Sequence, residues 1–435
     1  MIRIFLSIVF SFLLVNCSFN ENSRIWNNKN KELEKNKKTK NTKIILDKKK
    51  ETPKEFNSTL KLSLSKIIMN NDIFDNQNNF GVQNYSGKLN KINSYKFSRF
   101  NEPEQLNFQP LFLSNGLIFF DHKGSVIRYD NNGKILWKKN NYNKLEKKSS
   151  PKLSFSRNGN NLIVTDNLSK FYLINIDTGE LIWSKRNIYP FNSEIKTLKD
   201  KFFVVDLKNI LRCFYIKDGS ECWNLKTENS LTVSNSKNSL ILDEKLVIFS
   251  NIVGDITAVD FNTGLIIWQL PTQSSEIINE TYNFKISRLV SDKKAIFFSN
   301  SKNEFYSIDK KNGSVNWINK VRSNLTPILV GDLIMTISDE GYLYAIDKNQ
   351  GNIIRINDIF KDYKIKKRKF IKPTGFSVSQ KNIYVGTNNG KLKVIELNTG
   401  NNVRDLNISR EIISKPFIFN ENLFVIKNGA IIKYE

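Results

Sequence analysis

The residues that could carry covalent or metal chemistry are few in this chain of 435 residues: three cysteines and one histidine. Histidine is the usual base of nucleophilic triads and a common zinc ligand. Since His122 stands alone, the usual histidine-based triads and zinc sites are excluded. No Gly-rich phosphate loop and no Cys-x-x-Cys pair is evident either. The chemistry that remains to be considered is that of the thiols.

Cys17 stands at the end of a segment that is typical of an exported protein. A short basic start precedes an apolar run from Ile4 to Val15, which is too short for an ordinary transmembrane helix. Residues 1–16 are therefore predicted to be a signal peptide. The stretch Leu14-Val-Asn-Cys17 resembles the bacterial lipobox, with Asn16 where a small residue is usual. This resemblance implies cleavage before Cys17, a lipid on its sulfur and, because serine follows, sorting to the outer membrane.

Cys213 and Cys222 flank a predicted hairpin turn at Asp218-Gly219, so they could lie on adjacent strands. Two states remain open for this pair. An oxidising compartment permits a cross-strand disulfide, while two reduced thiols packed in the sheet are the state that we favour. If Cys17 is lipidated, no odd thiol is left over.

Tryptophan supplies the strongest pattern in the chain. Five of the six tryptophans lie four residues after a turn glycine, and they recur every 40 to 49 residues. Two further copies keep the glycine and carry arginine in the tryptophan slot: Gly351/Arg355 and Gly400/Arg404. A fixed period of this length indicates an array of similar units. The five tryptophans, which we expect to pack between units, are Trp137, Trp183, Trp223, Trp268 and Trp317.

Each unit contains short runs of β-branched and aromatic residues separated by Asn, Asp and Gly. In one copy, Leu246–Ser250 and Asp255–Asp260 precede the turn at Gly264 and the run Leu265–Trp268. An upstream run, such as Pro327–Val330 in the sixth copy, supplies a fourth strand. Four antiparallel strands in 40-odd residues are typical of one propeller blade, so the sequence predicts an all-β fold.

The glycine-anchored turns give seven units, and an eighth begins near Lys415 but ends at Glu435 without its last strand. A closed propeller hides its edges, so the missing strand should come from the other end of the chain. We predict that residues 88–100 supply it. The expected fold is a single eight-bladed β-propeller over residues 88–435, with seven blades as the alternative.

Residues 17–87 are expected to form a flexible tether. They are rich in Lys, Asn, Glu and Ser, and they contain too few clustered apolar residues to offset the entropy of ordering. The exception is the apolar island Leu60–Ile73, for which a short helix or docking on the propeller is expected.

The net charge of +25 invites a nucleic-acid hypothesis. However, 54 of the 67 basic residues are lysine, and the chain is also crowded with Asn and Ile. Much of the charge therefore reflects a compositional bias, and we expect no nucleic-acid partner. The densest basic run, Lys361–Lys369, is predicted to be a solvated loop, with contact to anionic lipid or an acidic partner as the alternative.

The segment Ala258-x-Asp260-x-x-Thr263-Gly264-x-x-x-Trp268 matches the repeat of propellers of the pyrroloquinoline-quinone (PQQ) type. Together with the lipobox and the size of the single domain, it makes the chain resemble the BamB family of outer-membrane assembly lipoproteins. The resemblance implies a non-enzymatic scaffold of the outer-membrane β-barrel assembly (BAM) complex on the periplasmic face of the outer membrane. It implies no cofactor or metal and a monomeric propeller. Its partners would be the POTRA domains of a BamA-like barrel protein and other BAM lipoproteins.

Members of that family contact the barrel subunit through loops near the fourth and fifth blades. By resemblance, the contact residues here are Leu231 and Val233 before the fourth blade and Glu280 and Arg288 before the fifth. Ser234 stands where the family has an arginine. The alternative function is that of a periplasmic PQQ-dependent dehydrogenase-like quinoprotein, although the adjacent cysteine pair that many such enzymes carry is missing.

Overall fold

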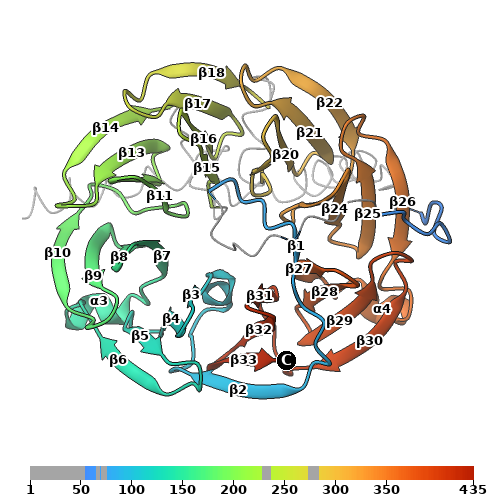
Figure 1. Cartoon of the computed structure of the whole chain (residues 1–435), viewed down its shortest axis with the longest axis horizontal. Coiled ribbons are helices and arrows are strands. Elements are labelled where there is room, and N and C mark those ends of the chain that lie inside the picture. The colour runs from blue at the N-terminus through green and yellow to red at the C-terminus, as the bar shows by residue number, and fades with distance from the viewer. Residues whose placement is uncertain (1–53, 65–68, 70–75, 228–236, 273–283) are drawn as a thin grey trace, which may run out of the picture. The chain divides into compact units, whose positions relative to one another are not determined.

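The computed structural model describes residues 54–64, 69, 76–227, 237–272 and 284–435. These residues form eight sheets around a central axis (Figure 1). In seven of them the strands follow chain order from the axis to the rim, and in the eighth the rim strand comes from the N-terminal side. The prediction of an eight-bladed β-propeller is therefore confirmed. Within these ranges, no helix has the length and apolar character that crossing a membrane would require.

The blades follow one another along the chain, and each contains four antiparallel strands. Blades 1 and 2 contain β3 (Leu111–Leu113), β4 (Gly116–Phe120), β5 (Val126–Tyr129), β6 (Ile135–Lys139), β7 (Leu153–Asn158), β8 (Asn161–Asp166), β9 (Lys170–Asn175) and β10 (Leu181–Arg186). Blades 3 and 4 contain β11 (Lys196–Leu198), β12 (Lys201–Val205), β13 (Ile210–Tyr215), β14 (Glu221–Lys226), β15 (Leu240–Leu242), β16 (Leu246–Ser250), β17 (Ile256–Asp260) and β18 (Ile266–Leu270).

The second half of the disc repeats this order. Blades 5 and 6 contain β19 (Val290–Ser291), β20 (Ala295–Ser299), β21 (Glu304–Asp309), β22 (Val315–Lys320), β23 (Ile328–Val330), β24 (Leu333–Ile337), β25 (Tyr342–Asp347) and β26 (Ile353–Asp358). Blade 7 contains β27 (Pro373–Ser379), β28 (Asn382–Thr387), β29 (Lys391–Glu396) and β30 (Asn402–Asn407). Blade 8 contains β31 (Phe417–Phe419), β32 (Asn422–Lys427), β33 (Ala430–Tyr434) and β2 (Lys91–Lys96).

The hairpin before each outer strand is closed by its own side chains. In blade 4 the Asp260 carboxylate accepts hydrogen bonds from the backbone N–H groups of Asn262 and Thr263, at 2.9 and 2.8 Å. Gly264 has a φ of +73°, which a residue with a Cβ adopts only with strain. The turn glycine is thus needed for its backbone conformation, as the sequence predicts.

The repeated tryptophans lie between blades. Each indole ring packs on the turn glycine of the next blade, and a Cβ added to Gly313 would come within 2.5 Å of the Trp268 ring. Four of the five indole N–H groups also donate to a carbonyl three residues before that glycine; in Trp268 the bond to Lys310 O is 3.2 Å long. The other three pairs are Trp137 with Ile176 O, Trp183 with Ile216 O and Trp317 with Lys348 O.

Arg355 takes over the tryptophan's place between blades 6 and 7. Its side chain is fully buried, and its guanidinium donates to Leu397 O, three residues before the turn glycine Gly400, at 3.1 Å. It also donates to Asn398 O and to Leu60 O. Burial lowers the pKa of Arg355 to about 10. The arginine therefore keeps the hydrogen bond of the repeat and adds a contact to the N-terminal segment.

The ring closes as the sequence predicts. β2, from the predicted segment 88–100, pairs antiparallel with β33 and forms the outer strand of blade 8. Tyr95 on β2 is buried and its ring packs edge-on against Tyr129 of blade 1. The sheet of blade 8 thus joins a strand from the N-terminal side of the propeller to the three C-terminal strands, so β33 is paired on both sides.

The chain before residue 88 packs on the propeller over much of its described length, which differs from the tether expected for 17–87. The compact unit begins at Lys54. Phe56 and Ile356 exchange backbone hydrogen bonds of 3.1 and 2.8 Å at the rim of blade 6. β1 (Val82–Gln83) pairs in parallel with β27, inside the ring. Composition predicted disorder here because this segment draws its partners from distant blades and not from itself.

Residues 76–83 cross the central opening of the ring (Figure 1). Asn78 is fully buried, and its side-chain amide donates to Leu240 O and Leu289 O at 2.9 Å each. Its carbonyl oxygen accepts a 2.6 Å bond from Lys196. One asparagine therefore joins the crossing segment to blades 3, 4 and 5.

Replacing Asn78 by alanine is expected to lower the free energy of unfolding by about 2–4 kcal/mol, because two buried carbonyls lose a donor and the Lys196 ammonium loses one acceptor. Chemical denaturation measures this loss. Asn57→Ala is the matched control, since Asn57 also has a positive φ (46°) but is exposed. An equal loss in both variants would show that backbone strain, and not the hydrogen bonds, is responsible.

Candidate functional site

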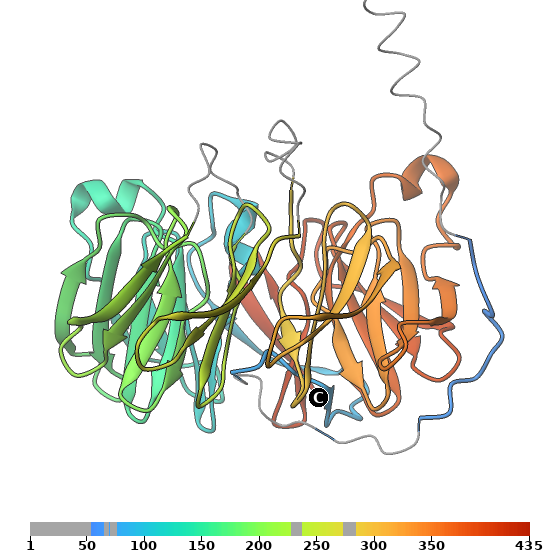
Figure 2. The same cartoon turned by 90° about the horizontal axis from the view of Figure 1, so that it is seen from above.

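The described loops that join one blade to the next lie on one face of the disc, which we call the connection face. Each runs from an outer strand to the next inner strand, so their common side follows from the repeated topology. The short helices α3 (Lys144–Lys148) and α4 (Ile365–Arg368) belong to two of these loops. Figure 2 shows both helices on the same side of the disc. The basic run 361–369 is thus partly helical and lies on this face.

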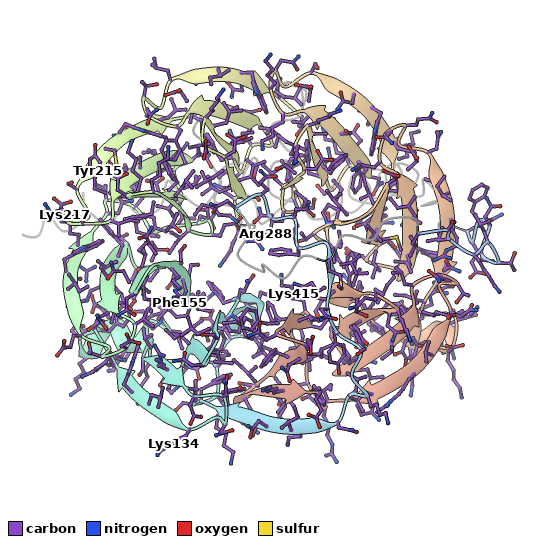
Figure 3. The ribbon with its side chains drawn as sticks, in the orientation of Figure 1. Lys134, Phe155, Tyr215, Lys217, Arg288 and Lys415 are labelled. Atoms are coloured by element: carbon purple, nitrogen blue, oxygen red, sulfur yellow. The ribbon has the colours of Figure 1, made fainter. Side chains whose placement is uncertain are left out.

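Four cations meet at the end of the central channel that opens on the connection face. They precede or begin the inner strands of four different blades, and we call them the axial basic cluster: Lys196, Lys237, Arg288 and Lys415. Figure 3 shows Arg288 and Lys415 beside the central opening. Glu194 is the carboxylate among them, and its oxygen accepts a bond from the Arg288 guanidinium at 3.2 Å.

The Glu194 carboxylate already accepts hydrogen bonds from several protein donors. Besides Arg288, its carboxylate accepts from the backbone N–H of Leu240 at 3.2 Å and from the Asn78 amide at 3.3 Å. Burial alone would raise the pKa of Glu194, but Arg288 and Lys196 hold it below its ordinary value. The carboxylate therefore compensates part of the cluster and is not available to the other two lysines as a close partner.

Lys237 and Lys415 have no ion pair among the described residues. The Lys237 ammonium lies 3.3 Å from the centre of the Phe108 ring, and that of Lys415 lies 5.1 Å from the ring centres of Phe80 and Phe417. The side chain of Lys237 is exposed and that of Lys415 is half-buried, so both reach water, although protein atoms surround each ammonium group. Burial, followed by repulsion from Arg288, lowers the pKa of each lysine to about 7.

These lysines give the stability of the fold a pH dependence. Their pKa of about 7 in the folded protein lies below the ordinary value of 10.5, so between these values the unfolded chain binds more protons. The free energy of unfolding should therefore rise as the pH increases from 6.5 to 8.5. The other charged groups facing the two lysines are Glu194, Lys196, Arg288 and Lys152, which is paired with Glu102.

Denaturation at a series of pH values tests this. The double variant Lys237→Gln/Lys415→Gln should have a smaller pH slope and should be more stable than the parent at pH 6.5. Lys134→Gln/Lys217→Gln, two exposed lysines at the rim (Figure 3), should keep the parent's slope. An unchanged slope in the channel variant would contradict the assignment.

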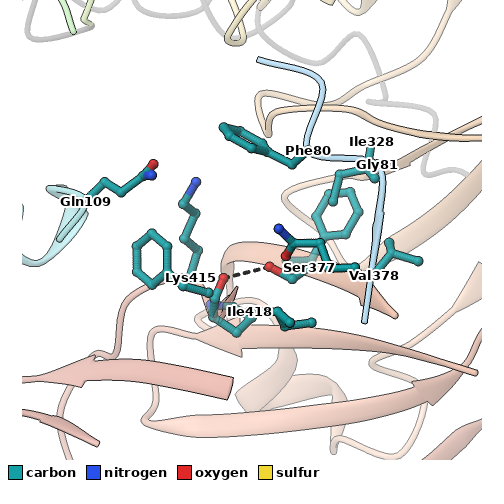
Figure 4. Close-up of a pocket in the computed structure, with 12 residues that line it drawn as sticks. Phe80, Gly81, Gln109, Ile328, Ser377, Val378, Lys415 and Ile418 are labelled. Atoms are coloured by element: carbon teal, nitrogen blue, oxygen red, sulfur yellow. Dashed lines mark hydrogen bonds between the residues drawn. The ribbon is translucent and has the colours of Figure 1, made fainter. Parts of the chain in front are cut away.

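A pocket lies beside Lys415, at the same end of the channel. It is lined by Phe80, Gln109, Ser377, Phe417 and neighbouring residues of the segment 76–83 and of blades 6, 7 and 8. Figure 4 shows the Lys415 side chain rising between Gln109 and Phe80. The Ser377 hydroxyl donates to Pro416 O at 2.7 Å and fixes the loop that carries the lysine. The pocket thus presents a cation against aromatic walls.

The side chains that converge on the axis do not suit a calcium–quinone centre. Hard cations such as Ca²⁺ take several oxygen ligands, of which carboxylates supply the charge. In the described ranges, no group of three or more His, Cys, Asp or Glu side chains could hold a metal ion. The carboxylate of Glu194 is surrounded by cations, which would repel a divalent metal.

Of the predicted contact and anchor residues, one lies in the described part of the chain. Cys17, Leu231, Val233 and Glu280 lie outside the described residues. Arg288 is described, and it belongs to the axial basic cluster: its guanidinium pairs with Glu194 and lies over the Phe80 ring. The ion pair holds Arg288 toward the axis, so the structure brings it together with Lys415 and not with an outward-facing loop surface.

Cys213 and Cys222 are brought together in blade 3. Cys213 lies opposite Trp223 on β14, and Cys222 is the bulged residue beside it. Both are free thiols in the structure, and a hydrogen bond joins them. This bond and burial raise the pKa of Cys213. The same bond lowers the pKa of Cys222. Counting thiols in the denatured protein distinguishes the two predicted states, with two reactive thiols expected for the reduced pair.

A comparison with protein-family models identifies the family of this propeller. Residues 122–357, more than half of the chain, match the family model of the outer membrane protein assembly factor BamB. The chain belongs to the BamB family. The match runs from just before β5 in blade 1 to β26 in blade 6 and contains all five repeated tryptophans. No curated protein matches the chain in the sequence search.

Solved structures share the fold of this BamB-family chain. BamB from Moraxella catarrhalis matches with a TM-score of 0.64 at 18% identity, covering 80% of this chain and 99% of that one. The computationally designed Ika8 protein matches with a TM-score of 0.60 at 12% identity, covering 78% and 99%. A quinohemoprotein alcohol dehydrogenase from Pseudomonas putida HK5 gives 0.57 at 11% identity, covering 80% and 76%. At these identities the likeness shows the propeller and no shared activity.

Proposed function

We propose that this protein is a non-enzymatic scaffold of the outer-membrane β-barrel assembly complex. Membership of the BamB family over residues 122–357 is the observation that carries the proposal. In it, a lipid on Cys17 holds the protein at the periplasmic face of the outer membrane. The monomeric propeller binds the POTRA domains of a BamA-like barrel protein, works beside other BAM lipoproteins and aids the insertion of barrel proteins.

The architecture supports a binding role. Eight hydrogen-bonded sheets closed through β2 and β33 make a stiff disc, and a stiff support lowers the entropy cost of presenting loops to a partner. The connections before blades 4 and 5 leave the rim at Lys226 and Leu270 and return at the axis. The described ends of both connections lie on the connection face, and in the sequence Leu231, Val233 and Glu280 belong to these connections.

Affinity purification of the tagged, membrane-extracted protein tests the proposal. A POTRA-containing barrel protein should co-purify, and Leu231→Asp/Val233→Asp should lower its recovery at least about tenfold, because burying a carboxylate at an apolar contact is costly. Ile188→Asp is the matched control: Ile188 is 78% exposed in the connection before blade 3. Recovery should be unchanged in that variant.

The same preparation separates the scaffold from the quinoprotein alternative. A scaffold should show no quinone absorbance and no dependence on calcium. A bound quinone chromophore together with dye-linked alcohol oxidation, and no barrel protein in the eluate, would overturn the proposal.

The lipid anchor is tested separately. Cys17→Ala should move the protein from the membrane to the soluble fraction.

A further inference from the structure

The axial basic cluster holds more positive charge than its surroundings compensate. Lys196, Lys237, Arg288 and Lys415 come from the inner ends of blades 3, 4, 5 and 8 and share one carboxylate, Glu194. Lys196 is held by the Asn78 oxygen at 2.6 Å, and Arg288 by Glu194 at 3.2 Å. Lys237 and Lys415 are left facing the channel with aromatic rings as their close contacts.

Such an arrangement is unfavourable without a counter-charge. Cations enclosed by protein lose part of their hydration, and ring contacts return only about 0.5–2 kcal/mol each. The repulsion is evident at both lysines, where burial and Arg288 favour loss of the proton. An anion beside Arg288 would offset this repulsion, and its attraction for the cations is stronger near protein than in bulk water.

The geometry limits the size of this anion. Residues 76–83 enter the channel from the face opposite the connection face, since Asn76 O and Gln77 O accept bonds from Leu242 and Ser291 at the far ends of β15 and β19. Asn78 and Phe80 then stand beneath the cluster, with the Phe80 ring 5.4 Å from the Arg288 guanidinium carbon. Residues 76–83 thus close the site on the side away from the connection face.

The polar groups of Asn78 and Glu194 that line the site already have hydrogen-bond partners in the protein. Asn78, fully buried, spans from blade 4 to blade 5, and the carboxylate of Glu194 is used by protein donors. What the site offers to a ligand is ammonium N–H groups and the edge of a guanidinium, which are donors suited to the oxygens of a phosphate group. A short, highly charged group fits this site better than a folded segment of a partner.

We propose that the axial basic cluster binds a doubly charged oxyanion of the phosphate type, either free or as the phosphomonoester head group of a lipid. Lys237, Lys415 and Arg288 donate to its oxygens, and Arg288 remains paired with Glu194. Residues 76–83 form the floor. This site is independent of the assembly function proposed above, so either can fail without the other.

Calorimetric titration of the full-length protein with inorganic phosphate at low ionic strength tests the site. Saturable binding of one phosphate is expected, together with a rise in Tm in phosphate relative to chloride at the same ionic strength. Lys237→Gln and Lys415→Gln should each weaken binding about tenfold, and the double variant about a hundredfold, since each removes one full charge near the ligand. Lys134→Gln and Lys217→Gln at the rim (Figure 3) should bind as the parent does.

Vesicles distinguish the two sources of the phosphate group. Binding to phosphatidylcholine vesicles that contain phosphatidic acid, in competition with inorganic phosphate and weakened in the double variant, identifies a lipid head group. Binding of inorganic phosphate alone identifies a free anion. The proposal is overturned if neither probe binds, if the channel variants bind as well as the rim variants, or if only a polyglutamate peptide binds. The channel variants should fold, because they remove repelling charges, and their Tm confirms this before titration.

Discussion

Replacing Arg355 by alanine is expected to lower the free energy of unfolding by about 3–5 kcal/mol. The guanidinium is fully buried between blades 6 and 7, and it donates to Leu60 O, Leu397 O and Asn398 O. Alanine would leave three carbonyls without this donor and a cavity in the place of the largest fully buried side chain of the described propeller. It would also release the rim contact of the N-terminal segment.

Arg404→Ala is the matched control, since Arg404 occupies the same slot one blade later. Its side chain is exposed, and its guanidinium donates to Lys88 O at 3.3 Å. Loss of an exposed side chain of this kind should change stability by about 0.5 kcal/mol or less. Guanidinium chloride titrations of both variants give the comparison. Similar losses in the two would mean that burial of the arginine does not matter at this position.

Trp268→Ala should cost about 3–5 kcal/mol, for a different reason. Trp268 is 8% exposed, its ring packs on the Gly313 turn of blade 5, and its N–H donates to Lys310 O at 3.2 Å. Removing the indole leaves a gap between two blades that touch mainly through side chains, because hydrogen-bonded strands lie within a blade. The loss therefore falls on the contact between neighbouring sheets.

Ile267→Ala provides the control for this prediction. Ile267 adjoins Trp268 on β18 but is 50% exposed, so about 0.5 kcal/mol or less should be lost. Gly313→Ala approaches the same contact from the other side: its Cβ would meet the Trp268 ring, and its φ of +74° is unfavourable for alanine. A loss below about 1 kcal/mol in Trp268→Ala would argue against inter-blade packing as the role of the tryptophan.

The fold could be predicted because its signal is local and repeated. A glycine with positive φ recurs in the first seven blades, and a tryptophan follows it four residues later in five of them, so the errors at one copy are corrected by the others. Closure through β2 and β33 followed from the strand missing at the C-terminal end. Arginine in the tryptophan slot was visible at Arg355, but its burial was not, since Arg404 in the same slot is exposed.

The N-terminal segment could not be predicted in the same way. Asn78 obtains its partners from Leu240 and Leu289, which lie 162 and 211 residues away along the chain. Nothing local distinguishes this asparagine from the many others in an Asn-rich stretch. Composition therefore predicts a tether, whereas tertiary contacts hold residues 76–83 in the channel.

The axial basic cluster left a weak signal in the sequence. Glu194, Arg288 and Lys415 each stand two residues before an inner strand, a position that the repeat places at the channel mouth. A comparison of that position between blades would have identified these three residues as neighbours. The background of 54 lysines hides it, because most of them are solvated at the rim and in loops.

Direct binding to the barrel subunit is the measurement that tests the assembly proposal most directly. The full-length protein, extracted with its anchor, would be titrated with the purified POTRA domains of the barrel protein from the same organism. The account predicts saturable binding that Leu231→Asp/Val233→Asp weakens at least about tenfold and that Ile188→Asp leaves unchanged. Absence of binding in the parent protein, or equal binding by all three, would contradict the account.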